Sequence, residues 1–225
     1  LVERAHAPVP QPGNAVDPKL SDRLNAEQCS AVRALDQASV VLLSGGPGTG
    51  KTSTVVEILA RAEARHPGLR IGLAAPTGKA ARRLGEAVLA QRALLPCSTL
   101  HRWLEAGSRG FSRHRHRPLE LDLLVIDEMS MLDLALTQAL LEALPSSCRL
   151  LLVGDPAQLP PVGSGAVWHR LQQPGVRDRF GAGAVHLERP YRNRGALAQM
   201  AQQLRLGDLP AFAADLAALP EQANL

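Results

Sequence analysis

Apolar runs and helical periodicities alternate along this chain. Short runs rich in Val, Leu and Ile are typical of buried strands, and apolar residues at every third or fourth position are typical of helices. The predicted strands are 40–44, 70–75, 121–126, 149–154 and 184–187. The predicted helices are 25–37, 51–65, 77–92, a short one near 98–105, 133–143, 165–173, 194–206 and 211–219. Strands alternating with helices predict an α/β fold with a parallel sheet and helices on both faces.

Two segments do not follow this alternation. Residues 1–20 contain four prolines and little periodicity, which predicts a linker or the tail of an upstream domain. Residues 107–119 are irregular and basic, so they form either a solvated loop or a short hairpin insertion. In an open parallel sheet ligands bind at the carboxyl ends of the strands, so we expect the functional residues in the loops that follow them.

The loop after the strand 40–44 has the spacing of a P-loop. It is Gly-x-x-x-x-Gly-Lys-Thr, and a helical pattern follows it at once. Glycines let backbone N–H groups surround an anion, and the helix that starts near Gly50 turns its positive end toward the same phosphates. Lys51 is expected at the β- and γ-phosphates and Thr52 on Mg²⁺. The predicted nucleotide-binding residues of this loop are Gly45, Gly46, Pro47, Gly48, Thr49, Gly50, Lys51, Thr52 and Ser53.

Carboxylates end the strand 121–126. Asp127 and Glu128 are costly at the end of a buried strand unless a cation or a reaction uses them, although a helix cap is the alternative for such acids. In a P-loop protein Asp127 is expected to hold Mg²⁺ with Thr52, and Glu128 to orient or deprotonate the attacking water. After the strand 149–154, Gln158 is placed to contact the γ-phosphate; the alternative is a proline-rich turn.

A second candidate anion site follows the strand 70–75. Thr77, Gly78 and Lys79 open a predicted helix, where backbone N–H groups and a lysine favour an anion. Two such sites on one sheet edge exceed what ATP requires, and the backbone of a nucleic acid is the natural second anion. An ordinary capped helix with an exposed lysine remains the alternative.

Composition limits the class of protein without naming it. The chain is 45% hydrophobic and 20% charged, with a formal net charge of +4, so a polyanionic partner is allowed. No apolar run is long enough to span a membrane, so we expect no membrane partner. Cys29, Cys97 and Cys148 have no metal or redox spacing, which suits a reducing cytoplasm.

Seven motifs occur in a diagnostic order. They are LNAEQCSAV (24–32), GGPGTGKT (45–52), APTGKAARRL (75–84), STLHRWL (98–104), LLVIDEMSMLD (123–133), GDPAQLPPVGSG (154–165) and LERPYRN (187–193). This set resembles the RecD-like superfamily 1 (1B) DNA helicases over roughly residues 22–207. The resemblance implies a RecA-like motor domain over 21–190. It also implies a helical region over 191–225, which leads to a second RecA-like domain that this sequence does not contain.

The resemblance assigns further residues. Gln28 would recognise adenine, Tyr191 would stack on the base, and Arg192 would act as an arginine finger on the γ-phosphate. A packed aromatic residue beside a surface charge is the alternative for the last two. The resemblance also implies that two motifs contact DNA, through Pro76, Thr77, Gly78 and Lys79 in the first and Ser98, Thr99 and His101 in the second.

The function implied is that of a motor. Helicases of this family couple the hydrolysis of ATP, with Mg²⁺, to 5′-to-3′ movement on single-stranded DNA in recombinational repair of double-strand breaks. The parent protein would act alone or with the beta and gamma subunits of exodeoxyribonuclease V. A P-loop ATPase that acts on a protein partner is the alternative from another class, and stimulation of ATP hydrolysis by single-stranded DNA separates the two.

Overall fold

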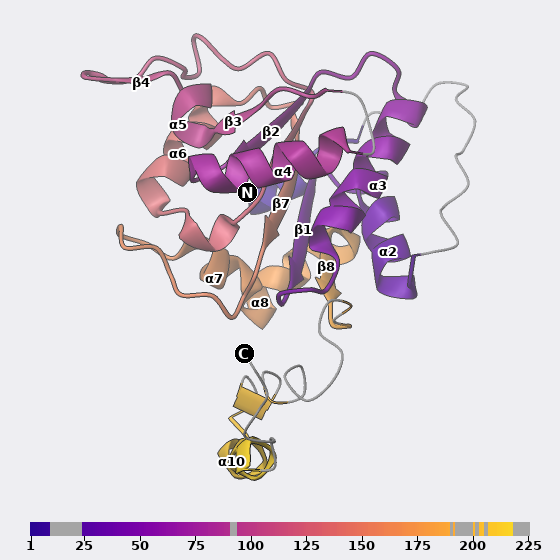
Figure 1. Ribbon diagram of the computed structural model, residues 1–225. Coiled ribbons are helices and arrows are strands. Elements are labelled where there is room, and N and C mark those ends of the chain that lie inside the picture. Colours follow the sequence, from indigo (N-terminus) through magenta and orange to yellow (C-terminus); the bar gives the residue numbers. More distant parts are fainter. Residues whose placement is uncertain are drawn as a thin grey trace.

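A six-stranded parallel sheet forms the centre of the molecule (Figure 1), in a computed structural model that describes residues 1–9, 24–90, 94–189, 191, 200, 203–204 and 207–217. The strand order is β3-β2-β6-β7-β1-β8, and every neighbouring pair is parallel. The strands of this sheet are β1 (Val40–Gly45), β2 (Ile71–Ala75), β3 (Cys97–Thr99), β6 (Leu123–Ile126), β7 (Arg149–Gly154) and β8 (Ala184–Leu187).

Helices connect the strands. The helices before β6 are α1 (Val2–Ala5), α2 (Ala26–Ala34), α3 (Lys51–Arg65), α4 (Gly78–Leu89) and α5 (Leu100–Trp103). Those after β6 are η1 (Met129–Met131, a 3₁₀ turn), α6 (Leu134–Ala143), α7 (Val167–Gln172), α8 (Pro174–Arg177), η2 (Asp178–Gly183, also 3₁₀) and α10 (Leu209–Ala217).

Both faces of the sheet are covered, as the sequence predicts. Successive residues of a strand point to opposite faces, so Val41 and Leu43 of β1 pack with α2, α3 and α4 in one core. Val40 and Leu42 pack with α5, α6 and α7 in the other. Strands buried on both faces explain the continuous apolar runs in the sequence.

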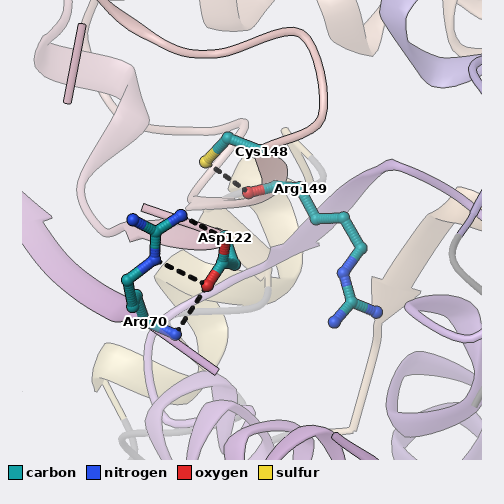
Figure 2. Close-up of polar contacts among 4 residues, drawn as sticks. All are labelled: Arg70, Asp122, Cys148 and Arg149. Atoms are coloured by element: carbon teal, nitrogen blue, oxygen red, sulfur yellow. Dashed lines mark hydrogen bonds and ion pairs between the residues drawn. The ribbon is translucent and has the colours of Figure 1, made fainter. Parts of the chain in front are cut away.

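Polar contacts join the strands at the amino edge of the sheet. The Arg70 guanidinium donates to both carboxylate oxygens of Asp122, at 3.0 Å from Nε and 2.8 Å from Nη2, and the Arg70 backbone N–H also donates to Asp122. Figure 2 shows Arg70 and Asp122 facing each other, while the Arg149 side chain extends away from them. The Arg149 backbone N–H donates to the Asp122 carbonyl at 2.9 Å. These contacts join β2, β6 and β7 at the end opposite the P-loop.

The segment near 98–105 differs from its prediction. A single short helix was predicted, but residues 97–99 form β3, which pairs with β2 through Ala74–Ser98 and Ala75–Thr99, and only α5 is helical. Three residues at the edge of a sheet, each half-buried, lack the apolar run that marks the inner strands. The predicted helix 194–206 lies largely outside the described residues.

The basic stretch 107–119 begins within a small hairpin. Strands β4 (Ala106–Gly107) and β5 (Gly110–Phe111) pair in antiparallel fashion. Glu105, at the base of the hairpin, forms ion pairs of 2.7 Å with both Arg113 and Arg117. Two of the basic side chains in this stretch are therefore used within the loop itself.

The first residues of the chain lie against the sheet. Leu1, Val2 and Ala5 pack on the core that contains α6 and α7, and the Arg4 guanidinium donates to the carbonyl of Cys148 at 3.0 Å and to that of Pro145. Part of the segment 1–20, predicted as a linker or the tail of an upstream domain, thus contacts the domain. In the described part of the chain, no helix is both long and apolar enough to cross a membrane.

Candidate nucleotide and nucleic-acid site

A cavity of about 670 Å³ opens at the carboxyl edge of the sheet. This volume is within the range of ligand pockets. Residues from several separate loops line it, and they include most of the P-loop, both carboxylates after β6 and residues after β7. The sequence-predicted residues among them are Gln28, Pro47, Gly48, Gly50, Lys51, Thr52, Ser53, Asp127, Glu128, Gln158 and Tyr191.

The P-loop has the backbone that its glycines allow. Gly48 and Gly50 have φ values of +76° and +85°, a region that favours glycine. A Cβ atom on Gly50 would also lie 2.7 Å from the Gln28 side-chain nitrogen, so the end of the Gln28 side chain would have to move. Helix α3 begins directly after Gly50, so its amino end faces the loop. This arrangement is a phosphate cradle at a helix N-terminus.

Lys51 spans the P-loop. Its Nζ donates to the carbonyl oxygens of Gly45 at 2.7 Å and Gly46 at 2.9 Å, which holds the ammonium group over the loop. The Thr49 hydroxyl also donates to the Gly46 carbonyl, at 2.9 Å. The neighbouring Thr52, the second residue of α3, lines the cavity.

Asp127 and Glu128 both line the cavity. Asp127 accepts a hydrogen bond of 2.8 Å from the Glu128 backbone N–H. Burial raises the pKa of the Asp127 carboxyl above its ordinary value, and the charges of Lys51 and Arg83 act against that rise. Glu128 has φ +56° and ψ +43°, a left-handed conformation that is costly for a residue with a side chain. Such strain gathers at functional sites, and here it accompanies a candidate base.

The loop after β7 contributes Gln158 and Asp155. The Gln158 side-chain oxygen accepts a 2.7 Å hydrogen bond from the buried hydroxyl of Ser130, which follows the carboxylate pair. The buried Asp155 accepts from the Ala157 backbone N–H at 2.9 Å. Gln158 is thereby tied to the segment that contains Glu128, which suits a residue that senses the terminal phosphate.

Gln28 and Tyr191 both lie beside Gly50 of the P-loop, although they are 163 positions apart in the sequence. Asn25 connects them: its side chain donates to the Tyr191 hydroxyl at 2.7 Å and accepts from the Gln28 backbone N–H at 2.8 Å. The Tyr191 backbone N–H donates to the Gly48 carbonyl at 2.7 Å. The residues that sequence reasoning gave to the base of the nucleotide therefore lie together beside the phosphate cradle. Arg192 lies outside the described residues.

These residues fit a nucleoside triphosphate with Mg²⁺. Gly48 and Gly50 give the loop the left-handed backbone of a phosphate cradle, and Lys51 and the amino end of α3 provide positive charge. Mg²⁺ is usually bound by one or two carboxylates together with substrate phosphates. Thr52 and Asp127, the pair that the sequence predicts on Mg²⁺, both line the cavity, together with the acidic residues Glu57, Glu128 and Asp155.

The two predicted DNA motifs lie side by side. Pro76 to Lys79 follow β2 and Ser98 to His101 span the end of β3, and these two strands are paired. Thr77 caps α4 by accepting from the Ala80 backbone N–H at 3.2 Å, and Thr99 caps α5 in the same way at 3.3 Å. Thr77 is therefore a helix cap, as the alternative interpretation of this motif expects. Its hydroxyl accepts in this contact and can still donate to a phosphate. Lys79 and His101 are exposed.

The sequence matches the family described as AAA domain over residues 28–164, more than half of the chain. The chain belongs to this family. It is also homologous to RecD-type helicases. It is 43% identical over 201 residues to the "ATP-dependent RecD2 DNA helicase" of Deinococcus radiodurans, covering 88% of this chain and 26% of that protein. It is 41% identical over 231 residues to the "RecBCD enzyme subunit RecD" of Mycolicibacterium smegmatis, covering 92% and 41%.

Solved structures agree on the fold of this AAA domain. A structure of two coordinating Pif1 helicases at forked DNA matches with a TM-score of 0.62 and 21% identity, covering 91% of this chain and 53% of that one. Pif1 helicase from Candida albicans matches with a TM-score of 0.57 and 22% identity, covering 82% and 44%. The chain therefore spans about half or less of each of these proteins, and its RecA-like α/β fold is established.

Sequence reasoning missed three charged residues of the AAA-domain cavity, Glu57, Arg83 and Asp155. Asp155 follows β7 directly, so the rule that placed Asp127 could have found it. Arg83 comes from the middle of α4, where a charged residue on an amphipathic helix normally faces solvent. Its position four residues after Lys79 was the available signal, since residues so spaced lie on the same side of a helix.

Proposed function

We propose that this chain is the first motor domain of a RecD-like DNA helicase. It binds ATP with Mg²⁺ and couples hydrolysis to 5′-to-3′ movement on single-stranded DNA in recombinational double-strand break repair, in the cytoplasm. The observation that carries the proposal is the layout of one sheet edge. The nucleotide cavity lies over β1, β6 and β7, and both predicted DNA motifs follow β2 and β3 on the other side of β6.

The sequence-predicted polar side chains of the cavity each have a role in this proposal. Lys51 neutralises the β- and γ-phosphates, and Gln28 and Tyr191 bind the base. Mg²⁺, held by Thr52 and Asp127, would stabilise charge on the phosphate oxygens. Glu128 accepts the proton of the attacking water. Gln158 contacts the terminal phosphate and, through Ser130, transmits its presence to the segment that contains Glu128.

The relatives' names leave two arrangements for the parent protein. One relative is named as a helicase and the other as a subunit of an enzyme complex. In the second arrangement we propose the beta and gamma subunits of exodeoxyribonuclease V as partners. Copurification of the intact protein with such subunits decides between the arrangements.

Stimulation of ATP hydrolysis by single-stranded DNA tests the motor proposal on the intact protein. Lys79→Ala should weaken binding of single-stranded DNA and reduce the salt dependence of that binding by about one phosphate contact. Arg82→Ala is the matched control, because Arg82 is exposed on the same helix and lies outside both the first turn and the cavity. An equal salt slope in wild type and Lys79→Ala, together with hydrolysis indifferent to DNA, would favour a protein partner instead.

A further inference from the structure

One helix connects the two halves of the proposed site. Helix α4 begins at Gly78, within the first DNA motif, and Lys79 is exposed in its first turn. Arg83 lies four residues later, on the same side of the helix, and lines the nucleotide cavity with Lys51, Asp127 and Glu128. Arg82, which immediately precedes Arg83, is exposed and does not line the cavity.

The surroundings of Arg83 are acidic. Asp127, Glu128 and Asp155 line the same cavity, and the charge of Arg83 acts with that of Lys51 to lower the pKa of Asp127. A bound triphosphate would add further negative charge there. A guanidinium group presents several N–H donors in a fixed plane, a geometry that matches phosphate oxygens. Arg83 is exposed at the cavity, so its long side chain is able to reorient toward a ligand.

We propose that Arg83 contacts the terminal phosphate of bound ATP and links it to DNA bound at the first turn of α4. The inference deepens the proposed function. Its claim about DNA rests on the proposed DNA-binding role of the first turn of α4, whereas the contact with the terminal phosphate does not. ATP and ADP differ in the terminal phosphate, so Arg83 would distinguish the two nucleotides. A small displacement of α4 on binding DNA would move Lys79 and Arg83 together, because one helical turn connects them.

Nucleotide binding without DNA tests the phosphate contact. We would measure the affinities of the purified protein for ADP and for the non-hydrolysable analogue AMP-PNP, both with Mg²⁺, by calorimetry. Arg83→Ala should lower the affinity for AMP-PNP about ten-fold, as expected for one charge-assisted hydrogen bond. The affinity for ADP should stay within about two-fold.

Two further variants separate the contact from a general effect of charge. Arg82→Ala removes the same charge from the preceding position and should leave the affinities for ADP and AMP-PNP unchanged. Arg83→Lys should recover part of the AMP-PNP affinity, because it keeps the charge and loses the planar fork. The inference is overturned if Arg83→Ala behaves like Arg82→Ala, or if it weakens ADP and AMP-PNP equally. Alanine favours helix, so loss of α4 is not expected in either alanine variant.

The link to DNA has its own measurement. Binding of a single-stranded oligonucleotide should raise the wild-type affinity for AMP-PNP, and by reciprocity AMP-PNP should raise the affinity for the oligonucleotide by the same factor. In Arg83→Ala this factor should fall close to one, whereas Arg82→Ala should keep it. If the oligonucleotide does not change the affinity of the wild-type protein for AMP-PNP, the link between Arg83 and DNA is overturned, together with the proposed motor function. The comparison of ADP with AMP-PNP would then still decide the phosphate contact.

Discussion

At the scale of single residues, Glu128 combines three properties that only a site explains together. Its backbone has a left-handed conformation, its side chain lines the cavity, and its N–H donates to the Asp127 carboxylate. That hydrogen bond stabilises the charged form of Asp127, the candidate Mg²⁺ ligand. The strained backbone at Glu128 therefore has two consequences. It turns the Glu128 N–H toward the Asp127 carboxylate, and it places the Glu128 side chain at the cavity.

Glu128→Gln should separate binding from chemistry. The amide keeps the shape of the side chain but cannot take a proton from water, and general bases contribute about 10²–10⁴-fold to rate. We expect nucleotide affinity, measured by calorimetry, to survive while turnover of the intact protein falls by that factor. Glu142→Gln, an exposed change on α6 that preserves the hydrogen bond to Gln138, is the control. Loss of affinity and turnover together would make Glu128 a structural residue.

Single residues also show where sequence reasoning ends. Gln28 and Tyr191 could be assigned only through the resemblance, because nothing local reveals that Asn25 joins them. The P-loop needed no such help, since its glycines and Lys51 are consecutive. Arg83 was missed because its contribution depends on how α4 packs beside α3, and the sequence of one helix does not contain that information.

At the scale of elements, burial explains which strands were predictable. The inner strands β1, β2, β6 and β7 are apolar throughout or nearly so, because both of their faces are covered. The edge strand β3 is half-buried and contains Cys97, Ser98 and Thr99, so its sequence resembles a loop. The order of the strands could not be read from the pattern, but their shared carboxyl edge followed from the parallel fold.

The ion pair at the amino edge makes a prediction about pH. Hydrogen bonds from Arg70 lower the pKa of Asp122, so its stabilising effect is present above the ordinary carboxyl pKa near 4 and is lost as the pH falls through the lower folded value. Asp122→Asn should therefore destabilise the domain by about 0.5–1 kcal/mol at pH 7, a modest effect because both side chains are partly exposed.

Urea denaturation of wild type and Asp122→Asn, at pH 7 and then in steps down to pH 3, measures this effect. The difference between the two proteins should shrink toward the acid end, and it should also shrink when salt is added. Glu142→Gln is again the control, and it should show little difference from wild type at any pH. A difference that stays constant from pH 7 to pH 3 would mean that Asp122 acts through its shape and not its charge.

At the scale of the whole molecule, the site occupies one open edge of a single sheet. The cavity, the DNA motifs and the hairpin of β4 and β5 all follow carboxyl ends of strands or the short helix after β3. The sequence spans 26% of one relative and 41% of another. Its resemblance to superfamily 1 motors implies that ATP is hydrolysed between two RecA-like domains, and we expect this sheet to provide one wall of that interface.

Residues 1–225 on their own should therefore bind Mg²⁺-ATP weakly, hydrolyse it very slowly and unwind no duplex. The P-loop, the carboxylates and Gln158 suffice for binding. Beyond Arg192, the transition state requires a further cation from a second wall, and an arginine finger is worth roughly 10³–10⁵ in rate. Movement along DNA also requires two DNA-binding surfaces that move relative to each other. The carboxyl edge of this sheet provides one such surface. A strand-displacement assay on a tailed duplex, with the intact protein as the positive control, measures this. Strand displacement by the 225 residues alone would show that one domain contains both surfaces.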